Sequence, residues 1–174
     1  MIEIAGENMF ENEIALDIDS AVITGPTGVV GVALVRKLLE NGTRVAAVCR
    51  PGSKRIDNLP NDTQLETVEL PLSELMNLPY ILKGRGFTEA NAFFHLGWDA
   101  SFGIDARNDL TLQMENAQRS VEAVEVAAAL GCEVFVGTGS QAEYGRFDGV
   151  LTSDTPTRPE NGYGAAKLSA CHMT

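Results

Sequence analysis

The sequence predicts an α/β fold in which a doubly wound parallel sheet carries helices on both faces. Short apolar runs recur along the chain and alternate with segments of helical spacing. The first apolar run is followed by a glycine-rich turn that opens a helix. Apolar residues make up 44% of the 174, enough for the core of one domain. Strands that alternate with helices are joined by right-handed crossovers, and the strands therefore run parallel.

Five strands and four helices are predicted along the chain. The strands are short apolar runs at residues 20–25, 44–49, 65–70, 91–97 and 133–139. The helices are predicted at residues 28–42, 73–84, 108–130 and from about residue 162. Gly42 stands where a helix ends. The second helix is predicted to open at Ser73 and to be disturbed at Pro79.

Residues 1–19 are predicted to be an acidic extension of a domain formed by residues 20–174. They contain six acids and no base: Glu3, Glu7, Glu11, Glu13, Asp17 and Asp19. The net charge of −11 argues against nucleic-acid binding. No run approaches the length of a membrane span or reads as a secretory signal, so we expect a cytoplasmic protein. Three widely spaced cysteines give no metal-binding pattern, and no metal is predicted.

The turn TGPTGVVG after the first strand predicts a dinucleotide site. Gly25 permits the tight turn, Gly28 lets a pyrophosphate approach the backbone, and Gly31 lets helix and strand pack closely. The N-terminus of the helix then faces the phosphates with its free amides. The alternative interpretation is an ordinary turn with a packing glycine.

The end of the second strand bears on which dinucleotide is bound. NAD-type domains place an acid there, which binds the adenosine ribose 2′-OH. This sequence has Cys49 and then Arg50. Arg50, with Ser53, Lys54 or Arg55, would hold a 2′-phosphate through charge-assisted hydrogen bonds. We therefore predict NADP as the cofactor, with NAD as the alternative; in that case Arg50 stacks on adenine or lies in solvent.

Tyr163 and Lys167 are the predicted catalytic pair. They lie four residues apart on the last predicted helix and therefore share one face. A nearby ammonium stabilises a phenolate, so Tyr163 would exchange a proton with an alcohol or carbonyl while the cofactor exchanges hydride. Ser140 would bind the substrate oxygen, although a serine after a strand also forms turns.

Taken in order, these motifs resemble the extended short-chain dehydrogenase/reductases, and more narrowly the NAD(P)-dependent epimerase/dehydratase family that acts on nucleotide sugars. The resemblance covers residues 20–174 and rests on TGxxGxxG, FHLG, Asn116, GSQAEYG and YGAAK. It implies an NAD(P)-binding Rossmann fold. It also implies that Ser140 polarises the substrate, that Tyr163 is the acid/base, and that Lys167 assists it and holds the nicotinamide ribose.

The resemblance further implies which residues contact the cofactor. Gly25, Thr27, Gly28 and the amide of Val29 match the phosphate loop. Leu96 and Gly97 match the strip beside the cofactor, and Asn116 matches an asparagine that steadies the active-site region. An ordinary polar helix residue is the alternative for Asn116.

The sequence departs from the family pattern in three places. Pro71 stands near the position where the family carries an aspartate beside the adenine. Gln141 and Ala142 follow Ser140, where the 4,6-dehydratases carry an Asp-Glu pair, which argues against dehydration. The chain also ends within the helix of Tyr163, so we expect the front of a longer enzyme without its C-terminal substrate region.

The predicted function is an epimerase or reductase of a nucleotide sugar. A non-catalytic NADP-binding module, an inactive fragment, and a reductase of a non-sugar carbonyl are the alternatives. The small and apolar residues of the long helix predict a homodimer, and a core face explains them equally well. Trp98, the only tryptophan, would border the nicotinamide or the substrate, or pack under a loop, and His95 is expected at the edge of the core.

Overall fold

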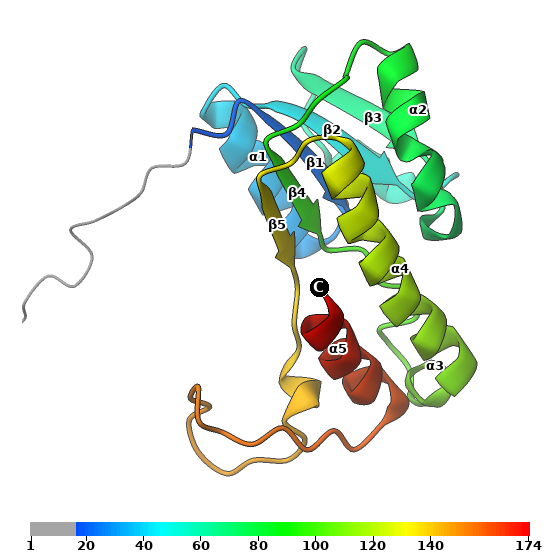
Figure 1. The fold of residues 1–174 in the computed structure, drawn as a ribbon, viewed down its shortest axis with the longest axis vertical. Coiled ribbons are helices and arrows are strands. Elements are labelled where there is room, and N and C mark those ends of the chain that lie inside the picture. The colour runs from blue at the N-terminus through cyan, green and yellow to red at the C-terminus, as the bar shows by residue number, and fades with distance from the viewer. Residues whose placement is uncertain (1–16) are drawn as a thin grey trace, which may run out of the picture.

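A computed structural model of the chain describes residues 17–174 (Figure 1). The predicted acidic extension, residues 1–19, therefore lies almost entirely outside the described residues. One sheet has the strand order β3-β2-β1-β4-β5, and all neighbouring strands are parallel. The strands are β1 (Ser20–Thr24), β2 (Arg44–Cys49), β3 (Leu65–Glu69), β4 (Ala92–His95) and β5 (Val134–Gly137).

Helices cover both faces of this sheet, which confirms the predicted fold class (Figure 1). Helix α1 (Val29–Glu40) packs on one face, and α2 (Leu78–Gly84) and α4 (Leu110–Ala129) pack on the other. In β1, Ile23 points toward α1 and Val22 toward the opposite helices. Because both faces are buried, the strands read as continuous apolar runs rather than as an alternating pattern.

Two predicted helices differ in detail from the structure. The segment predicted at residues 73–84 is a 3-10 helix, Leu72–Asn77, followed by α2. Pro79 lies in the first turn of α2, where its missing N–H leaves no helix bond unmade, so it does not disturb the helix. Pro71, not Ser73, precedes the 3-10 helix at its cap position. The helix predicted from residue 108 is preceded by a short α3 (Ile104–Asn108).

The final helix, α5 (Gly162–Met173), begins as predicted. It lies against α4, beyond the carboxyl end of β5 (Figure 1). Ala117 of α4 and Ala166 and Ala170 of α5 pack together there. Other small residues of α4, such as Ala123, pack on the sheet. Packing within the chain thus accounts for small residues on α4, and the homodimer stays a prediction.

Short 3-10 helices complete the described chain at Lys54–Asn58 and Gln141–Glu143. Neither was predicted, since each is too short for a periodic pattern. Among residues 17–174, no helix combines the length and apolar character needed to cross a membrane.

Candidate cofactor groove and active site

The loops after β1, β2, β3 and β4 line one groove of about 260 Å³ at the carboxyl edge of the sheet. Parallel sheets of this kind bind their ligands at that edge. The groove gathers six of the predicted cofactor residues: Gly25, Thr27, Gly28, Arg50, Leu96 and Gly97. Three separate loops thus contribute predicted contacts to one hollow.

The glycine turn after β1 leaves room where a ligand would need it. Gly25 has a left-handed backbone (φ 67°), and a Cβ there would lie 2.8 Å from the Gly97 nitrogen. A Cβ on Gly31 would overlap the Gly25 carbonyl oxygen and lie 2.7 Å from Pro26. A Cβ on Gly28 would meet nothing closer than the Gly25 oxygen at 3.6 Å. Gly25 and Gly31 are therefore required by packing, whereas Gly28 faces open space.

The N-terminus of α1 is chemically suited to an anion. Gly28 is its cap residue, with no side-chain cap hydrogen bond, and the first turn contains no acid. The side chain of Val29 is 93% exposed, so the start of the helix is not covered by the protein. Free amides and the positive end of the helix dipole favour a phosphate at such a position. The residues present therefore fit the pyrophosphate of a dinucleotide.

Gly28→Ala should remove dinucleotide binding without unfolding the chain. The added methyl group fits the folded protein but occupies the space into which the pyrophosphate would come. Gly31→Ala is the matched comparison, because its methyl group collides with the backbone of the turn. This substitution should lower the free energy of unfolding by about 2 kcal/mol or more. Cofactor titration together with urea unfolding distinguishes the two. Unchanged binding by Gly28→Ala would place the pyrophosphate elsewhere.

Arg50 lies at the mouth of the groove, and its side chain is exposed. Ser53 and Arg55 line the same hollow. Glu69, at the end of β3, accepts a hydrogen bond from the Gly52 N–H at 2.8 Å and so braces this loop. Sequence reasoning missed Glu69 because it is brought to the loop by the pairing of β2 with β3. Pro71 also lines the groove, at the place where the family carries an aspartate.

Side chains of helix α4 hold the loop after β4 in place. The Asn116 side chain donates to the Asp99 carbonyl at 2.8 Å and accepts from the Asp99 N–H at 3.0 Å. Arg119 forms an ion pair with the Asp99 carboxylate at 2.8 Å. Asn116 is buried and does not line the groove. Its predicted influence on a cofactor would therefore act through the position of this loop.

Tyr163 and Lys167 both contact the ring of Trp98. The Tyr163 ring is nearly perpendicular to it, in a T-shaped contact with ring centroids 5.8 Å apart. The Lys167 Nζ lies 3.9 Å from the centroid of the Trp98 ring and donates to the Thr138 carbonyl at 2.8 Å. The Arg107 guanidinium lies over the Tyr163 ring at 4.6 Å. The predicted pair thus points toward one place, as its spacing requires.

Lys167 is unusually buried for a lysine, at 5% exposure. Burial penalises the ammonium and lowers the pKa of Lys167 to about 8, and the charge of Glu143 opposes part of that shift. A lysine with a pKa near neutrality changes its charge under conditions where enzymes work. Sequence spacing placed Lys167 on the correct face but gave no information about its burial.

Ser140 caps the 3-10 helix Gln141–Glu143. Its Oγ accepts from the Ala142 N–H at 3.1 Å, and its N–H donates to the Glu143 carboxylate at 2.6 Å. The turn-forming alternative for Ser140 is therefore realised in the structure. The hydroxyl hydrogen is not used by this cap, which leaves a donor for the predicted substrate oxygen. The turn packs tightly on α5, because a Cβ on Gly164 would overlap the Ala142 carbonyl oxygen.

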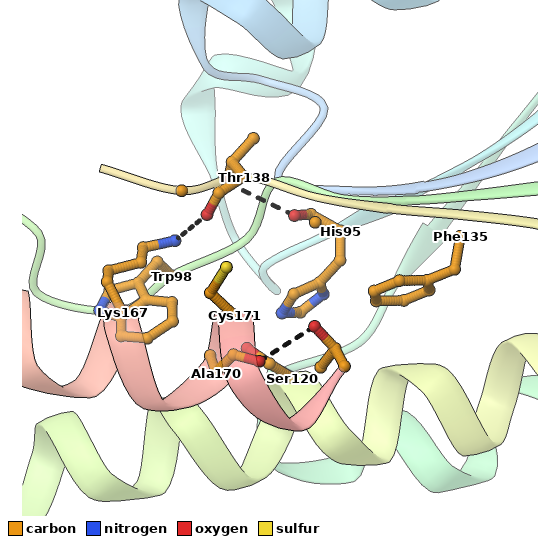
Figure 2. Close-up of a pocket in the computed structure, with 11 residues that line it drawn as sticks. His95, Trp98, Ser120, Phe135, Thr138, Lys167, Ala170 and Cys171 are labelled. Carbon is orange, nitrogen blue, oxygen red and sulfur yellow. Dashed lines mark hydrogen bonds between the residues drawn. The ribbon is translucent and has the colours of Figure 1, made fainter. Parts of the chain in front are cut away.

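A second pocket, of about 160 Å³, lies between the end of β5 and helices α4 and α5. Figure 2 shows His95 and Lys167 on its walls, with Trp98 beside Lys167. The His95 Nδ1 lies 2.9 Å from the Thr24 Oγ1, which in turn accepts from the Gly97 N–H. We assign the proton of the neutral ring to Nε2, because the buried Thr24 hydroxyl then donates to Nδ1. The Nε2 atom is buried without a hydrogen-bond partner.

His95 is held neutral in this pocket. Burial and, to a smaller extent, the charge of Lys167 lower its pKa to about 4. The imidazole also stacks on Phe135, with ring centroids 6.4 Å apart. The expected place of His95 at the edge of the core agrees with its 4% exposure. Its contact with the Lys167 region was not foreseen.

The profile of the NAD dependent epimerase/dehydratase family matches residues 21–174. The chain belongs to this family. The match covers most of the chain and confirms the resemblance seen in the sequence motifs. Family members are described as epimerases and dehydratases that depend on NAD.

Known proteins that are similar to this chain match it over about half of their own length. A dTDP-6-deoxy-L-talose 4-dehydrogenase (NAD(+)) from Aggregatibacter actinomycetemcomitans is 29% identical, over 84% of this chain and 50% of its own. A D-erythronate dehydrogenase from Cupriavidus necator is 30% identical, over 85% of this chain and 47% of its own. The solved structure of MoeE5 with UDP-glucuronic acid and NAD is 28% identical, with a TM-score of 0.71, over 88% of this chain and 48% of that one.

Proposed function

We propose that this chain is the cofactor-binding part of an NADP-dependent epimerase or reductase that acts on a nucleotide sugar. One observation carries the proposal. The groove lined by the glycine turn and Arg50 is bounded by Trp98, and the Trp98 ring contacts both Tyr163 and Lys167. The candidate cofactor groove and the candidate acid/base pair therefore both contact Trp98. The named relatives support the substrate class, since the talose dehydrogenase and MoeE5 are described with dTDP- and UDP-linked sugars.

In the proposed reaction each residue has a separate task. A nicotinamide bound in the groove would supply or remove hydride. Tyr163 gives its phenolic proton to the carbonyl oxygen during reduction and takes it back during oxidation. The hydroxyl of Ser140 donates to the same oxygen and holds it beside Tyr163. The ammonium of Lys167 stabilises the phenolate that remains when Tyr163 has given up its proton.

Dehydration is not part of the proposal. Gln141 and Ala142 follow Ser140, so the pair of carboxylic acids expected for a dehydratase is missing from this turn. The carboxylate that the turn does contain, Glu143, is buried and occupied by the Ser140 N–H. Carbonyl reduction and epimerisation need only hydride transfer and one acid/base.

The proposed function is tested with UDP- and dTDP-linked sugars, using keto sugars with NADPH for reduction and hydroxy sugars with oxidised cofactor for epimerisation. We expect Tyr163→Phe to lower kcat by about two to four orders of magnitude, the usual contribution of a general acid. Tyr80→Phe is the matched control, because Tyr80 is 84% exposed on α2 and should keep full activity. A parent chain that binds NADPH but turns over none of these substrates would support a non-catalytic cofactor-binding module or an inactive fragment instead.

A non-sugar substrate is the second candidate. The relative from Cupriavidus necator is a D-erythronate dehydrogenase, and D-erythronate is a sugar acid without a nucleotide. The same motifs and the same acid/base would serve such a substrate. Adding oxidised cofactor with small hydroxy acids to the panel distinguishes this candidate, because turnover of a hydroxy acid without turnover of any nucleotide sugar would favour it.

The proposed preference for NADP over NAD rests on Arg50. We expect Arg50→Ala to weaken NADPH binding by about 10- to 100-fold, as expected for a lost hydrogen bond to a charged group, and to change NADH binding little. Arg36→Ala is the control, an arginine exposed on α1 away from the groove. The talose dehydrogenase and MoeE5 are both described with NAD. Tighter binding of NADH by the parent chain would therefore assign NAD.

A further inference from the structure

Trp98 separates the two hollows of the active-site region. It lines the cofactor groove and also the pocket that contains His95 and Lys167, and it is the one described residue that lines both. Figure 2 shows its indole beside the Lys167 side chain. A ligand that extends from the groove toward Lys167 would therefore meet Trp98.

The indole is fixed from behind by Gln113. Its Nε1 donates to the Gln113 Oε1 at 2.8 Å. The amide nitrogen of Gln113 donates to the carbonyls of Ala106 at 2.9 Å and of Ala100 at 3.3 Å. Gln113 is only 1% exposed, and its three partners leave it one orientation. Because Asn116 holds the adjacent Asp99, both the backbone and the ring of this loop are fixed on α4.

The fixed ring in turn restricts the side-chain conformations of Tyr163 and Lys167, the predicted catalytic pair. The helix sets where Tyr163 and Lys167 begin but not where their side chains end, because a free lysine side chain samples many rotamers. The Lys167 ammonium lies over the Trp98 ring, and the Tyr163 ring makes a T-shaped contact with it. Arg107 covers the Tyr163 ring, so that ring is contacted by both Trp98 and Arg107.

We propose that Trp98 is the positioning residue of the active site: its indole, anchored by Gln113, holds Tyr163 and the Lys167 ammonium in their relative places. The importance of this role for turnover rests on the proposed function, since it presumes that Tyr163 and Lys167 act as a pair. The positioning itself does not, and it can be measured on the purified chain without substrate.

The fluorescence of Trp98 provides the first test, because the chain has no other tryptophan. An ammonium on the ring face changes indole emission, so the emission should change as Lys167 loses its proton, with a midpoint near its lowered pKa of about 8. The same transition should be absent in Lys167→Met. A flat emission curve between about pH 6 and about pH 10.5, or an unchanged transition in Lys167→Met, would overturn the proposal.

Other titratable or charged groups near Lys167 have to be separated from it. They are His95 from β4, Glu143 from the turn before α5, Tyr163 with the neighbouring Arg107, and Cys171 on the wall of the same pocket. His95 titrates at lower pH, with a pKa of about 4. Tyr163→Phe keeps an aromatic ring beside Trp98 and removes the phenol, and Cys171→Ser removes the thiol. A transition that survives in both variants and is absent in Lys167→Met belongs to Lys167.

The second test compares two replacements of Trp98 by the pKa of the Lys167 amine, followed by NMR of 15N-labelled lysine. Trp98→Phe keeps an aromatic surface, and the pKa should stay near 8. Trp98→Leu removes that surface. Loss of the cation–π contact alone would lower the pKa, but burial is the largest cause of its shift, so release of the amine to solvent should raise the pKa toward the ordinary value of 10.5. Circular dichroism checks that both variants are folded. Equal pKa values in the two variants would show that Trp98 only fills space.

The two tests also distinguish this inference from the proposed function. A chain that shows the fluorescence transition and the pKa difference but turns over no substrate keeps Trp98 as a positioning residue and contradicts the proposed reaction. A chain with turnover but neither spectroscopic effect keeps the reaction and contradicts the role of Trp98.

Discussion

Lys167→Met is expected to make the protein more stable and to abolish whatever turnover it has. The side chain is 5% exposed, and the burial that lowers its pKa to about 8 also makes its charged form unfavourable in the folded chain. The shift from the ordinary value of 10.5 corresponds to at most about 3 kcal/mol at pH 7. Methionine fills similar space without a charge and removes this cost.

Part of the gain is offset by contacts that the ammonium makes. Its hydrogen bond to the Thr138 carbonyl and its position over the Trp98 ring are each worth about 1 kcal/mol. A net stabilisation of up to about 1 kcal/mol in urea unfolding at pH 7 therefore remains. Stabilisation that accompanies loss of activity is typical of a group retained for function.

The stability gained by Lys167→Met depends on pH. The folded pKa lies below the unfolded one, so between about pH 8 and about pH 10.5 the unfolded chain holds more protons than the folded chain. The free energy of unfolding of the parent chain therefore gains from Lys167 as the pH rises through this range. The advantage of Lys167→Met should shrink over the same range. Lys83→Met, on the exposed surface of α2, is the control and should show no such change. A destabilised Lys167→Met at pH 7 would contradict the account.

Local spacing was sufficient to predict the parts of the site that lie within one segment. The glycine turn is such a part, because Gly25, Gly28 and Gly31 act on one strand, turn and helix. The shared face of Tyr163 and Lys167 follows from the geometry of a single helix. The groove followed from the fold class, since a parallel sheet brings the loops after its strands to one edge.

The remainder of the site depends on contacts between segments far apart in the sequence. The hydrogen bond of Trp98 to Gln113 joins the loop after β4 to α4, and the contact of Arg107 with Tyr163 joins α3 to α5. A lone tryptophan, glutamine or arginine has no periodic pattern, so none of these contacts can be predicted from spacing. The 3-10 turns and the place of Pro79 were missed for the related reason that short elements show no period.

His95→Gln is expected to reduce the loss of stability in acid. His95 has a folded pKa of about 4 and an ordinary value of 6.5, so between these values the unfolded chain holds more protons. The stability of the parent chain should therefore fall as the pH drops from about 6.5 to about 4, with His95 contributing at most about 3 kcal/mol. Glutamine stays neutral over this range. The variant should be less stable at pH 7, because it loses the stacking on Phe135, but it should lose less on acidification.

The measurement is a set of urea unfolding curves for parent and variant between about pH 7 and about pH 4.5. Acidic side chains titrate in the lower part of this range, so the difference between the two proteins is the quantity to follow. His172→Gln is the matched control, since His172 is exposed near the end of α5 and should follow the parent. Parallel curves for His95→Gln and the parent would show that His95 is not held neutral by the fold.

Combining this variant with Lys167→Met tests whether the two buried groups share one pocket electrostatically. The charge of Lys167 is part of what lowers the pKa of His95, and burial is the larger part. Lys167→Met should therefore raise the pKa of His95 only partway and weaken the acid dependence without removing it. The effect of His95→Gln on acid stability should then be smaller in the Lys167→Met background than in the parent. Strictly additive effects would mean that the two side chains do not interact, despite lining the same pocket.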